Sequence, residues 1–225
     1  MQSLIKELRH AFEAHADSNR AQGMKAYMRN QFDYLGIPSP TRKEILKPFI
    51  RNYSWKGEED FIDLLRFLWT LPQREFKYIA LDFSFRFEKK LNPTSIPFFE
   101  SLIAKESWWD TVDGIAPHVI GNIVKRNINL REQLCDKWIN SENFWYQRSA
   151  IILQLKFRSQ TDFDLLKALI LRRADSKEFF VQKASGWALR QYSRINPNAV
   201  KQFIDENKIP SLAAREGMRL ILKSE

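Results

Sequence analysis

Apolar residues recur at helical spacing along most of the chain. No segment shows the strict alternation of apolar and polar residues that marks a half-buried strand, and glycine is scarce, at 7 residues. The pattern therefore predicts an all-α protein. We expect helices over 2–15, 18–35, 40–53, 57–70, 73–91, 95–105, 108–126, 129–140, 143–158, 162–172, 177–194, 197–207 and 211–223.

Residues that cap or break helices mark the boundaries of these segments. Ser39 before Pro40 predicts an N-cap followed by proline at the first helical position. The segments 70–73 and 107–110 match the capping box or its aspartate variant. Ser141 and Ser176, which are 35 residues apart, each lie just before an aromatic stretch. Breaks are expected at Gly36, Asn92-Pro93 and Asn196-Pro197.

Three segments correspond to one another at a spacing of 35 residues: 108–113, 143–148 and 178–183. Their corresponding aromatic residues are Trp109, Phe144 and Phe179. Their corresponding charged residues are Asp113, Arg148 and Lys183. A repeat of this length is typical of one helix pair of a solenoid, in which equivalent positions stack on one face. We therefore expect a single domain, 1–225, built as a curved solenoid of about six helix pairs with a concave binding face.

The formal net charge of +9 favours a polyanionic partner, either nucleic acid or an acidic membrane surface, although a merely basic protein is the alternative. A single cysteine, Cys135, excludes an internal disulfide framework and is typical of the reducing cytosol. The three histidines, His10, His15 and His118, are too scattered for a usual zinc site. No secretory signal and no apolar stretch long enough for a membrane span is evident. We expect a cytoplasmic protein.

Two neighbouring carboxylates call for different interpretations. Asp110 lies three residues after Ser107, so it can close a capping box and complement the helix dipole. Asp113 lies nearly one turn further along and shares a helix face with Trp109. Its structural interpretation is an ion pair with Arg148 or Lys183 of neighbouring repeats, and its functional interpretation is a chemical role on a basic surface.

Basic and aromatic residues share the face that carries Asp113. Cations aligned across repeats would follow a phosphate backbone, although a solvated charged surface is the ordinary alternative. These cations are Arg148, Lys156, Arg158, Lys183 and Arg190, with Lys25, Arg29, Arg42, Lys43 and Lys47 earlier in the chain.

A row of aromatic residues at helical spacing usually belongs to the hydrophobic core. Trp108 and Trp109 are adjacent, so one can be buried while the other faces the binding surface. Trp187 lies four residues after Lys183, on the same face.

At these residues the chain resembles the AlkD family of bacterial DNA alkylation-repair glycosylases, which consist of HEAT-like helical repeats. The resemblance runs nearly end to end. Its densest parts are SWWDTVDGIAPHVIG at 107–121, NFWYQRSAIILQLK at 143–156 and SKEFFVQKASGWALRQY at 176–192. Tyr27 in KAYMRNQF and the stretch LGIPSPTR at 35–42 also fit, although Pro38 stands where the motif has a polar residue.

The resemblance implies that the protein excises N3- and N7-alkylated purines from double-stranded DNA without a metal. We also expect a monomer that uses no cofactor. It implies that Asp113 is the catalytic carboxylate and that Trp109 and Trp187 frame the deoxyribose of the lesion. It also implies DNA contacts. Arg148 would hold phosphate, and the other expected DNA-binding residues are Tyr27, Ser39, Lys43, Lys156, Phe179, Phe180, Lys183 and Arg190.

This chemistry agrees with a lone carboxylate on a basic surface. An alkylated purine is already cationic, so it leaves without protonation, and one carboxylate beside aromatic faces can stabilise the oxocarbenium-like sugar. Ordinary glycosidases need two carboxylates because their leaving group must be protonated. Two other classes remain open: a non-catalytic HEAT-like protein that binds DNA structure, and a solenoid whose basic face binds an acidic protein.

Overall fold

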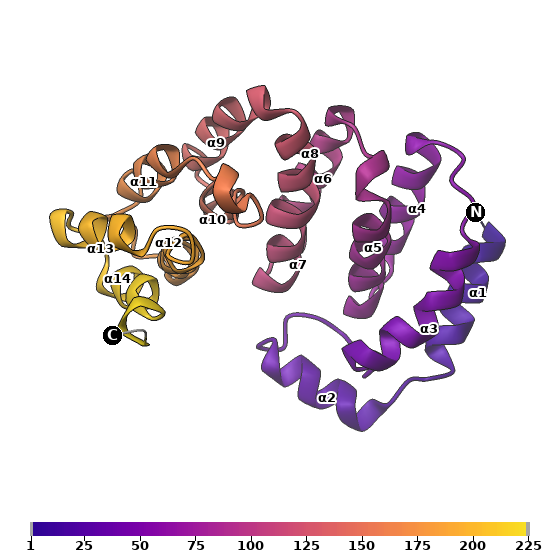
Figure 1. Ribbon diagram of the computed structural model, residues 1–225. Helices are drawn as coiled ribbons and strands as arrows, with labels where there is room; N and C mark the ends of the chain where they lie inside the picture. Colours follow the sequence, from indigo (N-terminus) through magenta and orange to yellow (C-terminus); the bar gives the residue numbers. More distant parts are fainter. Residues whose placement is uncertain (1, 224–225) are drawn as a thin grey trace. The chain divides into compact units, whose positions relative to one another are not determined.

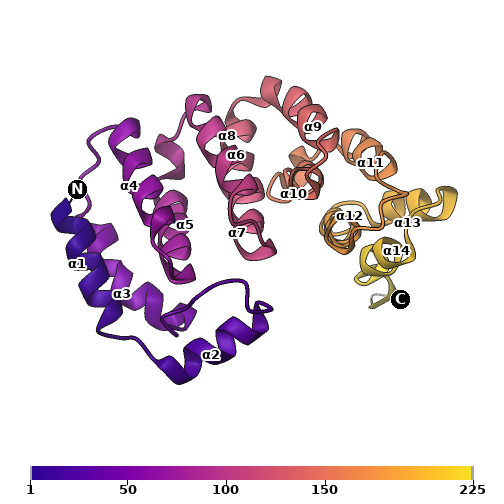
Figure 2. The same ribbon diagram turned by 180° about the vertical axis from the view of Figure 1, so that it is seen from behind.

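The computed structural model describes residues 2–223, and in this range the regular elements are helices, apart from one isolated bridge between Asp33 and Gln73. The predicted all-α class is confirmed. The helices fall into two compact units, Met1–Leu91 and Asn92–Glu225 (Figures 1 and 2). Among the described helices, none is both long and apolar enough to cross a membrane.

The first unit is built from five α-helices. They are α1 (Gln2–Glu13), α2 (Ser18–Tyr27), α3 (Ser39–Asn52), α4 (Glu58–Thr70) and α5 (Arg74–Phe87), followed by a short 3₁₀ turn, η1 (Glu88–Lys90). Helix α1 buries Ile5, Leu8 and Phe12, whose spacing of three and four residues places them on one face. Helices α4 and α5 lie side by side in both views (Figures 1 and 2).

Helix α2 ends at Tyr27, so the predicted helix over 18–35 is wrong in its second half. Arg29 and Asn30 adopt left-handed backbone angles, with φ of 54° and 59°, which terminate the helix. The following loop is fixed by Glu75 of α5. Its buried carboxylate accepts the backbone N–H groups of Leu35, Gly36 and Ile37 at 3.0, 2.9 and 3.1 Å.

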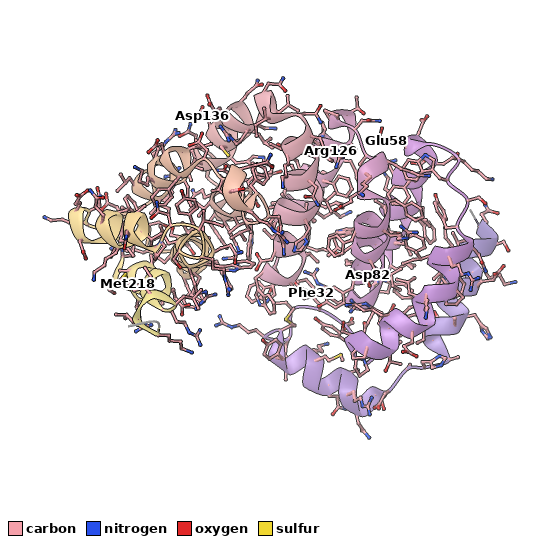
Figure 3. All side chains as sticks on the ribbon, viewed as in Figure 1. Phe32, Glu58, Asp82, Arg126, Asp136 and Met218 are labelled. Atoms are coloured by element: carbon pink, nitrogen blue, oxygen red, sulfur yellow. The ribbon has the colours of Figure 1, made fainter. Side chains whose placement is uncertain are left out.

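Polar contacts from α5 hold the rest of this loop and the start of α3. Arg42 donates to Asp82 at 3.1 Å, and both side chains are largely buried. The guanidinium of Arg74 lies 3.7 Å from the centre of the Phe32 ring (Figure 3 labels Phe32 and Asp82). One helix therefore positions both the loop after α2 and the first turn of α3.

The second unit is a two-layered stack of helices. Helices α9, α11 and α13 form one layer, and α10, α12 and α14 form the other (Figures 1 and 2). Its α-helices are α6 (Ile96–Ala104), α7 (Trp109–Gly114), α8 (Gly121–Arg126), α9 (Arg131–Ile139), α10 (Phe144–Ile152), α11 (Phe163–Leu171), α12 (Phe179–Tyr192), α13 (Pro197–Glu206) and α14 (Ser211–Met218). The short elements are η2 (Pro93–Ser95), η3 (Ile115–Ile120), η4 (Ile128–Leu130), η5 (Arg158–Gln160) and η6 (Ile221–Lys223).

Helices α7 and α8 are joined by η3, a wider π-helical segment that contains Pro117, so the predicted helix over 108–126 is continuous but irregular. Proline lacks the N–H group that a regular α-helical bond would need, and a local π segment accommodates that loss. At its end, Gly121 lets the backbone approach α10 closely. A Cβ atom at this position would lie 2.7 Å from the carbonyl oxygen of Leu153.

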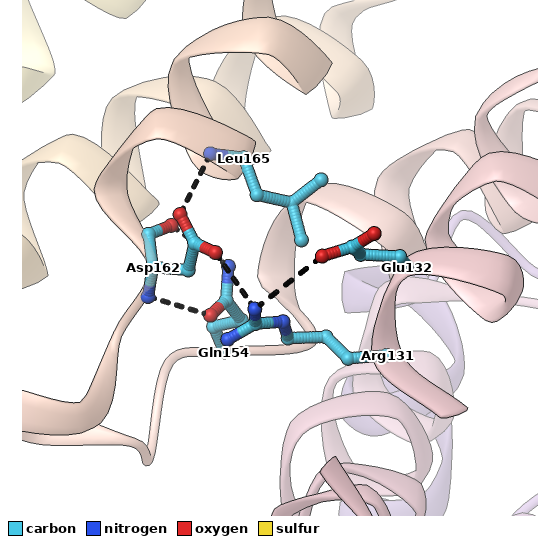
Figure 4. Close-up of polar contacts among 5 residues, drawn as sticks. All are labelled: Arg131, Glu132, Gln154, Asp162 and Leu165. Atoms are coloured by element: carbon cyan, nitrogen blue, oxygen red, sulfur yellow. Dashed lines mark hydrogen bonds and ion pairs between the residues drawn. The ribbon is translucent and has the colours of Figure 1, made fainter. Parts of the chain in front are cut away.

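Helix α10 stops at Ile152, six residues before the predicted end at 158. The Gln154 side chain accepts the N–H of Asp162 at 2.9 Å and donates to its carbonyl at 3.1 Å. Asp162 in turn caps α11 through the N–H of Leu165 and pairs with Arg131 of α9 at 2.7 Å (Figure 4). These contacts redirect the chain into α11 instead of extending α10.

Local contacts repeat at the predicted spacing. The carbonyl of Ser141 accepts the side chain of Gln147 at 2.7 Å, and the carbonyl of Ser176, 35 residues later, accepts that of Gln182 at 2.9 Å. Neighbouring repeats are also tied by ion pairs such as Arg172 to Asp136 at 2.8 Å (Asp136 is labelled in Figure 3). The helix pairing is that of a HEAT-like solenoid.

Several predicted caps are displaced. The N-cap of α3 is Pro38, so Ser39 is the first helical residue. The two predicted capping boxes are displaced as well, because Gln73 and Trp108, not Thr70 and Ser107, are the N-caps of α5 and α7. The hydroxyls of Thr70 and Ser107 donate to the carbonyls of Phe67 and Ile103. The N-cap positions fall at Asn143 and Glu178 instead of at Ser141 and Ser176.

Candidate active site

Asp113 lies in the last turn of α7, directly before the π-helical segment, and it is held by Arg148 of α10. The contact has two parallel hydrogen bonds. Nε of Arg148 donates to Oδ1 and Nη2 donates to Oδ2, each at 2.8 Å. The Asp113 side chain keeps 18% of its surface exposed, whereas that of Arg148 keeps 5%. The carboxylate therefore has a fixed orientation with one part open to solvent.

Arg148 is anchored on its other side by α12. Its Nη1 donates to the backbone carbonyl of Phe180 at 2.6 Å. Three of its nitrogens are thus engaged within the protein. The ion pair that the sequence offered as the structural interpretation of Asp113 is present. A phosphate contact by Arg148 stays a prediction, and it would require this buried arrangement to open.

Burial raises the pKa of the Asp113 carboxyl above its ordinary value, since desolvation disfavours the charged form. The hydrogen bonds and positive charge of Arg148 oppose this effect, and the negative charge of Asp110 adds to it. Asp110 lies in the first turn of α7, where it complements the helix dipole. The two carboxylates are therefore electrostatically coupled.

The partly buried aromatic cluster beside this pair is made by other residues than the three that the sequence aligned. Trp108, Trp145 and Phe180 pack together, with ring centres 4.9 to 5.8 Å apart. These are not the corresponding positions Trp109, Phe144 and Phe179 that the sequence aligned. Trp109 is half-buried and Phe179 is 54% exposed. Trp108 and Trp109 are both half-buried, so the expected contrast between one buried and one open ring is not seen in their burial.

Trp187 is half-buried on α12, in the same unit as the Asp113–Arg148 pair. Phe180 stacks on Phe144 with ring planes 5° apart, so its ring belongs to the aromatic cluster while its carbonyl binds Arg148. Trp109 and Trp187 are the two tryptophans expected to frame the deoxyribose of the lesion, and both keep part of their surface exposed.

Lys183 does not join the Asp113–Arg148 pair, although the sequence aligned the three residues. Lys183 and Arg190 both bind Glu216 of α14, at 3.0 and 2.5 Å. The sequence analysis missed Glu216. No local motif marks it, because its role depends on the packing of α14 against α12.

Lys156 is exposed just after α10 and lies near His118 of the π-helical segment. Burial lowers the pKa of His118, and the positive charge of Lys156 lowers it further. In residues 2–223, no group of three or more His, Cys, Asp or Glu side chains is placed to hold a metal ion.

The remaining candidates lie in the first unit. Tyr27 ends α2 and is 74% exposed, and Ser39 and Lys43 are exposed on the first turns of α3. Glu75 orders the loop between them and was missed, since nothing in its sequence neighbourhood predicts that its carboxylate accepts three backbone N–H groups.

The sequence matches the model of a protein family described as DNA alkylation repair enzyme over residues 8–221. Among solved structures, the fold is similar to a predicted DNA alkylation repair enzyme from Enterococcus faecalis, with a TM-score of 0.86 and 32% sequence identity. That match covers 92% of this chain and 97% of the other. No curated protein matches the sequence.

Proposed function

Because the chain belongs to the family of DNA alkylation repair enzymes, we propose that it is a monofunctional DNA glycosylase acting on cationic N3- and N7-alkylated purines in duplex DNA. The observation that carries the proposal is Asp113, an oriented and partly exposed carboxylate in the unit that also holds the half-buried Trp109 and Trp187, in a chain of net charge +9. Cationic alkylpurines such as 3-methyladenine and 7-methylguanine suit such a site.

The reaction needs little acid catalysis. Breaking the N-glycosidic bond leaves both bonding electrons on the base, which neutralises its positive charge. Water then forms the new bond to C1′ and gives up a proton, and the products are a free alkylpurine and an abasic site. Asp113 would stabilise the cationic sugar electrostatically and accept the proton from water.

Arg148 prepares Asp113 for this role. An ionised carboxylate has about four lone-pair positions, and the two bonds from Arg148 occupy two of them. The remaining positions can face the sugar and the water. The bidentate contact fixes the plane of the carboxylate, and preorganised charge of this kind is a large contributor to catalysis.

Aromatic faces and cations would supply the rest of the site. Trp109 and Trp187 would contact the deoxyribose, since aromatic faces attract developing positive charge. Lys156, Lys183 and Arg190 in the second unit would bind backbone phosphates, and Phe179 and Phe180 would contribute contacts near the lesion. In the first unit, Ser39 and Lys43 would bind phosphates and Tyr27 would contribute a further contact with DNA. We propose that the protein does this as a monomer.

The test is the release of free 7-methylguanine and 3-methyladenine from methylated duplex DNA, resolved by chromatography. Wild-type protein should release free base and leave abasic sites. Duplex binding without release would instead support the non-catalytic DNA-binding protein, for which the Asp113–Arg148 ion pair would be purely structural. Failure both to bind DNA and to release base would reject both functions.

A further inference from the structure

Helices α12 and α14 approach each other closely at Gly186. A Cβ atom on Gly186 would lie 2.5 Å from Cβ of Glu216 and 3.0 Å from the carbonyl oxygen of Ala213. Only glycine permits this separation, since real Cβ atoms essentially never come so near. The close approach brings the Glu216 side chain against the face of α12.

Glu216 joins two cations of α12. Its Oε1 accepts Lys183 Nζ at 3.0 Å, and its Oε2 accepts Arg190 Nη1 at 2.5 Å. Lys183 and Arg190 are seven residues apart, two helical turns, and they flank Gly186. One carboxylate therefore fixes two long side chains that would otherwise sample many rotamers.

Both cations can bind a further acceptor while they hold Glu216. A lysine ammonium has three donors and an arginine guanidinium has five, so one bond to Glu216 leaves most of them available. Their side chains are 37% and 26% exposed, whereas Glu216 is 15% exposed. Arg219 adds a third positive charge near the carboxylate. Three cations therefore surround Glu216, and its carboxylate is less exposed than Lys183 and Arg190, which hold it.

We propose that Glu216 is a positioning residue that holds Lys183 and Arg190 in place for contact with phosphates of the DNA backbone. This inference rests on the proposed function, because it assigns the partner as DNA. The proposal places an acidic residue on a surface that binds a polyanion, although repulsion between carboxylate and phosphate would by itself disfavour an acid there. Glu216 favours binding because it already restricts the side chains of Lys183 and Arg190, so they lose less conformational entropy when DNA binds.

The inference is tested by whether replacing Glu216 weakens or tightens the binding of DNA. Removing an acid from a DNA-binding surface should tighten binding if charge alone matters, since a carboxylate repels phosphate. Removing a positioning residue should weaken binding although the protein becomes more positive. We would measure the affinity for an undamaged labelled duplex by fluorescence anisotropy, at several salt concentrations, for wild type, Glu216→Gln and Glu178→Gln.

Glu178→Gln is the matched control. Glu178 is exposed at the N-terminus of the same helix, and its side chain makes no capping bond. We expect Glu216→Gln to bind roughly threefold or more weakly than wild type, in the range of measured coupling between contacting residues, and Glu178→Gln to bind equally or more tightly. Equal or tighter binding by folded Glu216→Gln, relative to Glu178→Gln, overturns the inference.

Glu216→Asp gives a second test that keeps the charge. Its side chain is one methylene shorter, so it cannot reach both cations, and its binding should weaken as well. Wild-type affinity for this variant overturns the inference, as does the unfolding of both Glu216 variants in circular dichroism. Base release is measured separately, so a wild type that binds duplex but excises nothing would reject the proposed activity and leave this inference standing.

Discussion

Arg148 donates to both carboxylate oxygens of Asp113 at 2.8 Å and, through its remaining terminal nitrogen, to the carbonyl of Phe180. A single guanidinium thus joins α7, α10 and α12. The orientation of the proposed catalytic carboxylate is consequently tied to the packing of three helices, so changes at either partner should affect both stability and chemistry.

Asp113→Asn should abolish excision and also destabilise the fold. The amide carries no charge and presents N–H groups toward Arg148, leaving a buried cation without its partner. Breaking a buried pair in this way costs about 3 kcal/mol, and less where one partner is partly exposed, as Asp113 is. The measurement is single-turnover base release per folded molecule, together with thermal unfolding. Asp110→Asn is the control and should retain excision; if it is the inactive variant, the catalytic assignment is wrong.

The rate of excision should have an acid limb above the ordinary aspartate pKa of about 3.9. Burial raises the pKa of Asp113, and only the ionised form can stabilise a cationic sugar, so the rate falls as the pH drops through this raised value. Arg148 opposes the rise, so Arg148→Gln should move the limb to still higher pH. The check is a pH profile of single-turnover release, and a limb that does not move argues against Arg148 as the group that tunes Asp113.

The same shift determines how Asp113 affects stability. Its folded-state pKa lies above the unfolded value, so protonation of Asp113 adds stability that is fully present below the unfolded pKa and is lost as the pH rises through the folded pKa. This effect compares two protonation states of Asp113, whereas Asp113→Asn also removes the charged partner of Arg148.

Trp109→Ala and Trp187→Ala should lower excision more than stability, because both side chains are only half-buried. Trp138→Ala is the structural counterpart. Trp138 is 1% exposed and its Nε1 donates to Glu100 at 2.7 Å, so truncation should cost about 3–5 kcal/mol. Chemical denaturation and base release per folded molecule separate the two classes. Normal excision by destabilised Trp109 and Trp187 variants would place both in the core.

Gly186→Ala should destabilise the second unit by about 1–3 kcal/mol, since the added methyl group would collide with α14. Gly23→Ala is the contrasting change. A Cβ at Gly23 meets nothing within 4 Å, and the residue lies inside α2, so alanine should stabilise by up to about 1 kcal/mol. Denaturation midpoints of the two variants should shift in opposite directions, and similar shifts would contradict the close approach at Gly186.

Sequence reasoning identified the class, the family and the pairing at a spacing of 35. The helical periodicity and the long motifs around Asp113 and Arg148 are local signals, and the family match and the fold confirm what they predicted. The contact between Asp113 and Arg148 was among the interpretations considered. The single domain over 1–225 and the roles of the site residues stay predictions.

Two of the errors have a common physical origin. The helix over 18–35 was predicted from its apolar pattern, but Glu75, some 40 residues away, binds the backbone of Leu35–Ile37 outside a helix. Lys183 was aligned with Arg148, but α14 supplies Glu216 as its partner. In both cases a carboxylate distant in sequence decides the outcome, and a repeat pattern contains no information about it.

Helix α2 buries none of its side chains. It is capped by Asp17, whose own backbone N–H donates to the carbonyl of Leu35 in the Glu75-bound loop at 2.8 Å. Its opening exposes almost no apolar surface, so it should cost much less than global unfolding. In native-state hydrogen exchange, the amides of α2 should lose their protons well before those of α5, while the amides of Leu35, Gly36 and Ile37 remain protected. Uniform exchange across the first unit would contradict this. Tyr27, at the end of α2, would then lie on a segment that opens more readily than α5.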